Sequence, residues 1–425
     1  MTIPASEIDV AIVGAGAAGL ATAIFTLQQQ PGVRLALLDG ARRPGAKILV
    51  SGGSRCNVTN SVVGEADFSG GRPSIIRTIL RAFPVAQTVA FFGDIGVPLH
   101  EEAGGKLFPD SNRSRDVLDA LLNEFTRCGS QVMSDHRVLE VAAAPGGYLL
   151  TTARGEVRSR AVVLATGGLS LPKTGSDGGG YEMARRFGHT IIPTTPALAP
   201  LLLSDAAGIH AELSGVSQHV GLELRVNGRV QKRTSGSLLW THFGISGPAA
   251  LDMSRHWLRA RANGNAPELF ASLSPDDTFE TLETRWIALA RQQPRISIQT
   301  SLATMLPAAL GSAILDRLAI AKTLRLSDLS RDGRRRLVHA ILEVPLGVTD
   351  SRGYNFAEAT AGGVDLSEIE PSTMESRKCG GLYLVGEILD VDGRIGGFNF
   401  QWAWSTARVA ARALARRFPA ARVCD

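Results

Sequence analysis

The feature that most constrains this fold is a glycine pattern near the start of the chain, Gly14-Ala15-Gly16-Ala17-Ala18-Gly19. Residues 8–14 before it are typical of a buried parallel strand, and the alanine-rich residues 17–29 after it predict a helix. In such a turn the first glycine permits the bend, the second lets the backbone approach a pyrophosphate, and the third lets helix and strand pack closely. The pattern therefore predicts a βαβ unit that binds a dinucleotide at a helix N-terminus.

An acidic residue supports this interpretation. Asp39 closes the second predicted strand, residues 33–39, where a carboxylate binds ribose hydroxyls. The alternative is a glycine turn between packed elements without a ligand, and the combination of strand, helix and acid favours the dinucleotide. The pattern alone does not distinguish FAD from NAD.

Two more segments favour a flavin. Residues 47–60 read Lys-Ile-Leu-Val-Ser-Gly-Gly-Ser-Arg-Cys-Asn-Val-Thr-Asn, and a glycine pair in this setting offers backbone donors to phosphate or flavin edges. Near the other end, residues 381–387 predict a strand that ends in Gly386-Glu387, with the acid at the ribityl hydroxyls. Residues 396–399 precede a helix expected from about Gln401, whose N-terminus would stabilise negative charge on a reduced flavin.

The rest of the chain divides by composition. Residues 137–165 predict a β-meander that leads back into a parallel strand, residues 197–275 are rich in strand patterns, and residues 276–340 read as charged helices. We predict an α/β protein whose cofactor domain is built from residues 1–195 and 346–425. A β-rich domain (196–275) and a helical domain (276–345) are expected between them.

Composition limits the cellular setting. The chain has 425 residues and four cysteines, Cys56, Cys128, Cys379 and Cys424, none in a Cys-x-x-Cys pair, so we expect no metal site and no dithiol couple. We find no apolar run long enough to span a bilayer and no signal peptide in residues 1–9, which predicts a cytoplasmic protein that does not bind membranes.

The chain is basic, with a net charge of +5 and a pI near 9.2. Several arginines fall in the last predicted helix: Arg408, Arg412, Arg416 and Arg417. We interpret the charge as a solvated face and expect no nucleic-acid partner, because no binding motif accompanies it. A mild positive field would still attract NADPH or an acidic substrate.

Five segments together carry a family resemblance: residues 13–19, 51–60, 165–180, 239–248 and 359–404. They resemble the HI-type conserved bacterial flavoprotein family, which includes aminoacetone oxidase-like enzymes and dehydro-bile-acid reductases. The resemblance spans essentially the whole chain and is least distinct over about 276–340. It implies bound FAD in a Rossmann-like domain of the two-dinucleotide-binding type, with an inserted β-barrel and a small helical domain.

With the motifs above, the resemblance implies a set of cofactor contacts, including a main-chain contact from Val138 to the adenine. The full expected set is Gly14, Ala15, Gly16, Ala18, Gly19, Asp39, Lys47, Gly52, Gly53, Arg55, Cys56, Asn57, Val138, Thr166, Gly167, Gly386, Glu387, Gly396, Gly397, Phe398 and Asn399. Two positions depart from the family pattern. Gly179 stands where an acid is usual, with Asp177 as a substitute, and Phe398 stands where tyrosine is usual.

Three other features allow more than one interpretation. Cys56 has no partner at short spacing, so we expect a packed, inert thiol in preference to a nucleophile and exclude disulfide reduction. His242 is the candidate catalytic residue, and it would either relay a proton or hold its loop through a hydrogen bond. The glycine-rich residues 174–180 would form an interdomain hinge or, less in keeping with their pattern, bind a second dinucleotide.

We therefore expect an FAD-dependent oxidoreductase that exchanges hydride between flavin and a small organic substrate. In one version NAD(P)H, bound transiently, reduces the flavin, which then reduces an activated C=C bond. An O2-dependent amine oxidase of the aminoacetone type and a non-catalytic flavin redox sensor are the alternatives. The sequence specifies neither the substrate nor the oligomeric state.

Overall fold

The computed structural model describes residues 8–204 and 210–419. Contacts divide the chain into a unit built from both of its ends and a second unit formed by residues 195–357. The first unit resumes at Glu358, beyond the predicted residue 346. Cys424 lies outside the described residues.

A mixed sheet forms the centre of the first unit, in the order β7-β2-β1-β10-β9-β8, with β20 also paired to β10. The neighbours of β1 and β2 are parallel, as is β20, whereas β8, β9 and the first half of β10 form the predicted antiparallel meander. Its strands are β1 (Ile8–Val13), β2 (Leu35–Leu38), β7 (Val132–Met133), β8 (Val138–Ala144), β9 (Gly147–Thr152), β10 (Gly155–Leu164) and β20 (Leu382–Leu384). Ile12, Val163 and Leu384 are fully buried, as expected for central parallel strands. This topology confirms the predicted Rossmann-like α/β fold.

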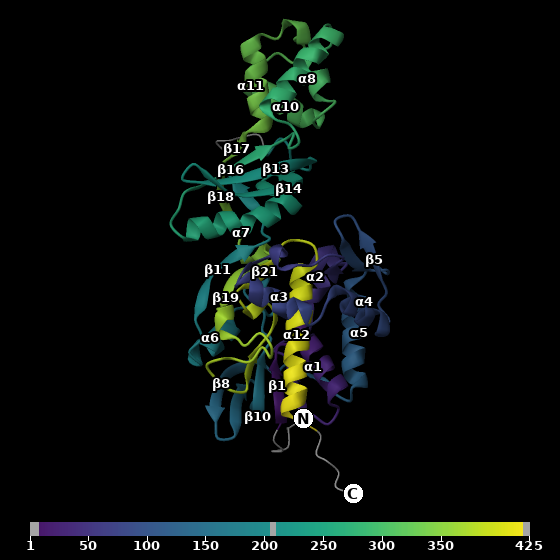
Figure 1. Ribbon diagram of the computed structural model, residues 1–425, viewed down its shortest axis with the longest axis vertical. Coiled ribbons are helices and arrows are strands. Elements are labelled where there is room, and N and C mark those ends of the chain that lie inside the picture. The colour runs from purple at the N-terminus through teal and green to yellow at the C-terminus, as the bar shows by residue number, and fades with distance from the viewer. Residues whose placement is uncertain (1–7, 205–209, 420–425) are drawn as a thin grey trace. The chain divides into compact units, whose positions relative to one another are not determined.

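The first and last helices of this unit lie side by side (Figure 1). The helices are α1 (Ala17–Gln29), α2 (Ala46–Ser54), α3 (Pro73–Arg81), α4 (Val85–Asp94), α5 (Ser114–Arg127), α6 (Gly179–Arg186) and α12 (Phe398–Arg417). The side chain of Gln30 donates a hydrogen bond to the carbonyl oxygen of Phe418 at 3.1 Å, which ties the end of α1 to the end of α12. Packing of these two helices places both ends of the chain in one domain.

Short strands complete the unit. They form three small sheets: β3 (Thr59–Asn60) with β6 (Lys106–Pro109) and β5 (Leu99–Glu102); β4 (Phe68–Gly70) with β21 (Val391–Gly393); and β11 (Ile191–Ala197) with β19 (Ala359–Val364). The β4–β21 pair joins a segment from before the second unit to one from after it, and β11 begins before the second unit and ends within it.

One stretch corrects the expectation about apolar runs. Residues 73–94 are apolar and long enough to cross a bilayer by composition alone. The chain breaks this stretch at Phe83-Pro84 into α3, of 9 residues, and α4, of 10 residues. A bilayer-spanning helix needs about 20 residues, so neither helix has the required length.

The second unit contains the predicted β-rich and helical regions. Its seven-stranded sheet lies where an inserted β-barrel was predicted and has the order β17-β16-β13-β14-β15-β12-β18. Within the described residues no pairing of the two end strands closes this sheet, so closure into a barrel stays a prediction. Its elements are β12 (Leu201–Leu203), β13 (Ser217–Val226), β14 (Arg229–Thr241), β15 (Gly244–Ser246), α7 (Pro248–Ala262), β16 (Pro267–Ser272), α8 (Phe279–Gln292), α9 (Ile298–Leu302), α10 (Ala308–Arg317), α11 (Arg331–Leu342), β17 (Val344–Leu346) and β18 (Val348–Ser351). Asn227 and Gly228 have φ of 52° and 73° and form the predicted hairpin turn between β13 and β14.

The two predicted inserts share one hydrophobic core. Trp240 and Trp257, from the sheet and α7, belong to the same buried cluster as Trp286 and Leu337, from α8 and α11. The helices therefore complete the core of the sheet, and the contacts group both regions as one unit.

Candidate functional site

The three glycines of the N-terminal pattern have three different steric roles. Gly14 has φ of +102°, and a Cβ there would lie 2.6 Å from the carbonyl oxygen of Ala165. A Cβ on Gly19 would lie 1.8 Å from the carbonyl oxygen of Gly14, so this position fixes the close packing of α1 on the loop. A Cβ on Gly16 would meet no protein atom within 4 Å. Of these three glycines, only Gly16 has open space at its Cβ position. Gly16 is the glycine predicted to face a pyrophosphate.

Asp39 is tied to this loop. Its carboxylate accepts a hydrogen bond from the Ala15 N–H at 2.7 Å and another from the Ala41 N–H at 2.8 Å. No side chain caps α1, so the N–H groups of its first turn retain their capacity for an anion. The fit to an adenine dinucleotide therefore includes an open loop, a helix N-terminus and an acid beside them. The contact of Asp39 with ribose stays a prediction.

The last residues of α2 and those that follow it have an unusual backbone. Gly52, Gly53 and Ser54 have φ of 55°, 66° and 67° in succession, and Cys56 has φ of 61°. A Cβ on Gly53 would meet nothing within 4 Å. Left-handed non-glycine residues are costly and gather at functional sites, so this loop has the character expected of a cofactor contact.

The side chains of this loop have distinct surroundings. Arg55 pairs with Glu102 at 2.7 Å and stacks over Phe108. Burial raises the pKa of the Cys56 thiol to about 12, which excludes a thiolate nucleophile and confirms the packed thiol. Among the described residues, the buried Oδ1 of Asn57 has no hydrogen-bond partner. A flavin, with its ribityl hydroxyls and ring N–H, has donors of the kind this oxygen lacks, so Asn57 fits the cofactor.

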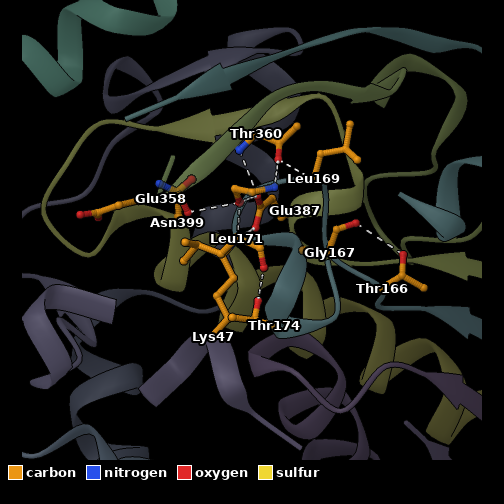
Figure 2. A network of polar contacts seen from close by, with 12 residues as sticks. Lys47, Thr166, Gly167, Leu169, Leu171, Thr174, Glu358, Thr360, Glu387 and Asn399 are labelled. Atoms are coloured by element: carbon orange, nitrogen blue, oxygen red, sulfur yellow. Dashed lines mark hydrogen bonds and ion pairs between the residues drawn. The ribbon is translucent and has the colours of Figure 1, made fainter. Parts of the chain in front are cut away.

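A polar network joins the two ends of the chain (Figure 2). Lys47 on α2 forms an ion pair with Glu387. The same carboxylate accepts hydrogen bonds from the Ser170 hydroxyl at 2.7 Å and from the Thr360 N–H at 2.9 Å. The Thr360 hydroxyl in turn accepts from the Leu169 N–H at 2.8 Å. Glu387 therefore has a structural role as a cross-link, and its contact with ribityl hydroxyls stays a prediction.

The C-terminal glycines allow other close approaches. A Cβ on Gly386, where φ is +75°, would lie 2.7 Å from the Cβ of Ala18 in α1. A Cβ on Gly397, where φ is +91°, would lie 2.4 Å from the carbonyl oxygen of Thr59. The side chain of Asn60 donates to the carbonyl oxygen of Gly396 at 3.1 Å. Gly386 thus lies against the start of α1, and residues 396–397 lie against residues 59–60.

The last helix begins at Phe398 rather than near Gln401, because Gly397 in the left-handed region starts it directly. Phe398 is fully buried beside Phe68, so its ring belongs to the core. The amide of Asn399 bonds to both the N–H and the carbonyl oxygen of Gly393, at 2.8 and 3.0 Å, and holds the preceding loop. Contacts of these two residues with a cofactor would therefore come from the backbone.

The remaining predicted contacts line the edge of the central sheet. Gly167 has φ of +72°. Its neighbour Thr166 packs against α6, because a Cβ on Gly180 would lie 1.9 Å from the Thr166 hydroxyl oxygen. Val138 is buried at the start of β8, and two residues before it the His136 N–H donates to the Asp39 carbonyl oxygen at 2.8 Å. The meander thus reaches the adenine-side acid, as the Val138 prediction requires.

The glycine-rich turn at residues 174–180 lies wholly within the first unit, so the interdomain hinge predicted there is wrong. The Gly178 N–H donates to the carbonyl oxygen of Gly168 at 3.2 Å, which anchors the turn to the end of β10. Asp177 accepts from Arg137 at 2.5 Å and from the Gly179 N–H at 3.1 Å. A Cβ on Gly179 would lie 3.3 Å from the Arg137 guanidinium, so an acidic side chain at position 179 would also reach this arginine. In this chain Asp177 provides the carboxylate that pairs with Arg137.

His242 lies in the second unit, at the tip of the β14–β15 hairpin. Its ring is exposed and meets Phe243 edge-on, with centroids 5.1 Å apart. Within residues 8–204 and 210–419 it makes no hydrogen bond, which argues against the loop-holding role. The proton-relay role stays a prediction.

Two other arrangements are excluded as the site. Ser376, His189 and Glu368 form a hydrogen-bonded chain, with His189 Nε2 2.8 Å from the serine hydroxyl and Nδ1 3.0 Å from the carboxylate. The His189 side chain is fully buried, so this chain has no access to a substrate. A cavity of about 420 Å³ between α4 and α5 is lined by acids such as Asp94 and Asp119, which would repel a dinucleotide's phosphates.

Sequence reasoning missed Ser170 and Thr360. Ser170 and Thr360 both stand within segments that supported the family resemblance, residues 165–180 and 359–404. Nothing local to either residue indicated Glu387 as its hydrogen-bond partner. Among the described residues, no group of three or more His, Cys, Asp or Glu is placed to hold a metal ion.

Comparison with known proteins places this geometry in context. The sequence profile described as the HI0933-like protein Rossmann domain matches residues 8–413. The 3-dehydro-bile acid delta(4,6)-reductase of Clostridium scindens is 30% identical over 408 residues, which cover 96% of this chain and 99% of that protein. The ribosomal RNA dihydrouridine synthase of Escherichia coli is 34% identical over 411 residues, covering 96% and 98%.

A solved structure, the 3-ketosteroid delta1-dehydrogenase of Sterolibacterium denitrificans, matches with a TM-score of 0.50 and 13% identity, covering 96% of this chain and 99% of that one. At this identity the match supports the fold alone.

Proposed function

This chain belongs to the HI0933-like Rossmann family, and from that premise we propose that it reduces a C=C bond conjugated with a carbonyl group, using electrons from NAD(P)H. It is an FAD-dependent oxidoreductase. The proposal adds the direction of the reaction, the electron donor and the class of substrate.

The observation that carries the proposal is the convergence of both chain ends on one open helix N-terminus. Gly16 leaves space for the pyrophosphate, and the close approach of Gly386 to Ala18 brings the C-terminal segment against the same helix. The loop with Asn57 and the N-terminus of α12 at Gly397 would hold the ring end. When bound, FAD supplies the hydride exchange at N5.

The direction rests on the relatives. A delta(4,6)-reductase and a dihydrouridine synthase are both named for the saturation of a C=C bond, in one case in a 3-dehydro steroid and in the other in a pyrimidine base. In both compounds a ring carbonyl activates that bond for hydride addition. The shared chemistry supports a reductase of conjugated C=C bonds in this chain.

We propose that the electron donor is NAD(P)H, which binds transiently. The sequence contains no second Gly-x-G-x-x-Gly in a complete βαβ unit, so we expect the nucleotide to bind in the substrate space and leave after reduction. Saturation of the C=C bond consumes one hydride and one proton. His242, an exposed imidazole, is the candidate acid for that proton. We place the protein in the cytoplasm, where its free thiols remain reduced.

The test is an anaerobic reduction of the yellow protein. We expect bleaching by NADH or NADPH, slow reoxidation by O2, and fast reoxidation by a 4-en-3-one steroid or by a uridine-containing RNA. Bleaching by an amine in place of the nucleotides would instead identify an oxidase. A flavin that neither nucleotides nor amines bleach would overturn the proposal and favour a redox sensor.

A further inference from the structure

The positive charge of the chain is concentrated in one short stretch. Residues 291–336 contain nine Lys or Arg and three Asp or Glu, which leaves 36 basic and 37 acidic residues for the rest of the chain. The net charge of this stretch, +6, therefore accounts for the whole net charge of +5. We call its nine cationic residues the basic face: Arg291, Arg295, Arg317, Lys322, Arg325, Arg331, Arg334, Arg335 and Arg336.

Most of the basic face lacks intramolecular anions. Lys322 pairs with Asp316 at 2.7 Å, and Arg334 lies 3.5 Å from Glu283. The others are exposed, and within the described residues none of them forms an ion pair. Arginines in the neighbouring sheet behave differently: Arg225, for example, pairs with Glu223 and Glu343, each at 2.6 Å. The exposed guanidiniums of the basic face therefore keep their binding capacity for an external anion.

The fold brings several of these arginines together. Residues 296–299 and 322–326 run side by side, with the Ile298 N–H donating to Leu324 at 2.9 Å and the Leu326 N–H donating to Ile296 at 2.9 Å. Arg325 lies within this pairing, opposite Ser297, and Arg295 immediately precedes it. Arg336 on α11 donates to the carbonyl oxygen of Leu318, the residue after Arg317, at 3.0 Å. Figure 1 shows α8, α10 and α11 bundled together in the second unit.

The apolar sides of these helices have a different task. Leu310, Ile314 and Leu337 are buried in the core of the second unit, so the arginines occupy the outer sides. None of the large hydrophobic residues that the described chain exposes falls within residues 276–342. A membrane-binding surface needs apolar groups that insert below the headgroups. The basic face therefore suits a soluble polyanion better than a bilayer.

We propose that the basic face binds the phosphate backbone of RNA. This inference rests on the proposed function, because uracil contains the conjugated C=C bond that such an enzyme reduces. Eight of the nine cations are arginine, whose planar fork binds phosphate oxygens in pairs. On the sequence alone we interpret the positive charge as a solvated face, because no binding motif accompanies it. The structure places these cations on α8, α10 and α11 and on the loops between them.

The test compares two variants with the same change in charge. R295Q/R317Q/R325Q removes three unpaired arginines of the basic face, and R72Q/R115Q/R158Q removes three exposed arginines of the first unit. Binding of a short fluorescein-labelled, uridine-rich RNA hairpin is measured by anisotropy over a range of salt concentrations. We expect the first variant to bind at least about tenfold more weakly, with the slope of log K against log salt reduced by about 2 to 3. The second variant should bind like the natural chain.

Further arms decide between explanations. R295K/R317K/R325K should retain most of the salt slope, since it keeps the charges. Equal weakening by both glutamine variants would show only an effect of total charge and overturn the proposal. Binding of phosphatidylglycerol vesicles or polyglutamate in preference to RNA would also overturn it. Bleaching by NAD(P)H and reduction of the steroid enone, followed on the same preparations, report separately on the proposed function.

Discussion

Replacing Gly16 with valine separates the dinucleotide role of the loop from its role in the fold. Gly16 has φ of −80° and ψ of −168°, an extended conformation open to any residue, and its Cβ position is free of protein atoms within 4 Å. The FAD-free variant should therefore lose no more than about 1 kcal/mol of stability, the usual difference between residues at a helix N-cap. Gly19→Val should unfold the domain instead, because its Cβ would lie 1.8 Å from the Gly14 carbonyl oxygen.

The effect on FAD should be much larger. A valine side chain would occupy the open space where the pyrophosphate approaches the backbone. Overpacking of this kind costs about 3 kcal/mol, which corresponds to roughly a 100-fold weaker Kd. We therefore expect Gly16→Val to purify colourless, with a normal melting temperature for the FAD-free protein, and to take up FAD only at greatly increased concentration.

The assay is a titration of FAD-free protein followed by quenching of flavin fluorescence, with thermal unfolding of the same samples. Gly32→Val is the matched control, since Gly32 also has open space at its Cβ position and stands at the other end of α1. Should Gly16→Val bind FAD as tightly as this control, the loop does not hold the pyrophosphate and the assignment of the site fails.

Three further perturbations have expected outcomes. Lys47→Met should destabilise the FAD-free protein by about 1–3 kcal/mol in urea unfolding, because it leaves the half-buried Glu387 carboxylate without its cation. The double variant with Glu387→Gln should recover part of this loss. A double variant no more stable than the single one would argue against the ion pair. Partial burial of Glu368 raises its pKa, but hydrogen bonds led by the one from Lys378 prevail and lower the pKa from 4.5 to about 2. Its carboxylate therefore stabilises the fold by roughly 3 kcal/mol above pH 4.5 and loses this contribution as the pH falls towards 2. The stability difference between the natural chain and Glu368→Gln should thus shrink on acidification, and a difference independent of pH would contradict the assignment. His242→Ala should still bind FAD and be bleached by NAD(P)H, but its rate of acceptor reduction should fall about 100-fold. His219 is an exposed histidine of the same unit, and His219→Ala should reduce the acceptor at the natural rate. Equal rates in the two variants would remove His242 from the mechanism.

The sequence predicted those parts of the site that depend on local pattern. The turn at Gly14, the helix over residues 17–29 and the acid at Asp39 follow one another within a single βαβ unit, and each element is where the pattern placed it. The meander before Thr166 was equally readable, because its turns are made by glycine. The start of α12 was missed by three residues because Gly397, itself counted as loop, serves as the N-cap.

Contacts between residues that are far apart in the sequence could not be predicted from local sequence patterns. The pairing of Lys47 with Glu387 joins positions that are 340 residues apart, and nothing near either residue indicates the other. The shared core of the inserted regions was also hidden. Charged, helical residues 276–340 read as a separate domain, whereas Trp286 of α8 and Trp240 of β14 are buried in the same cluster. Tertiary packing, which local patterns do not encode, decides both.

The described cofactor-site contacts and the excess positive charge lie in different units of the chain. The contacts of Asp39, Lys47 and Gly386 described above all lie within the first unit, which carries almost no net charge. The excess of basic over acidic residues lies in the second unit, within residues 291–336. The buried sides of the helices in this stretch complete the core of that unit. Substitutions at the outer positions of those helices leave the buried core and the Gly16 loop unchanged, so we expect neutralisation of the basic face to leave FAD bound. If neutralising the basic face instead released FAD, the two units would be coupled and this separation of roles would be wrong.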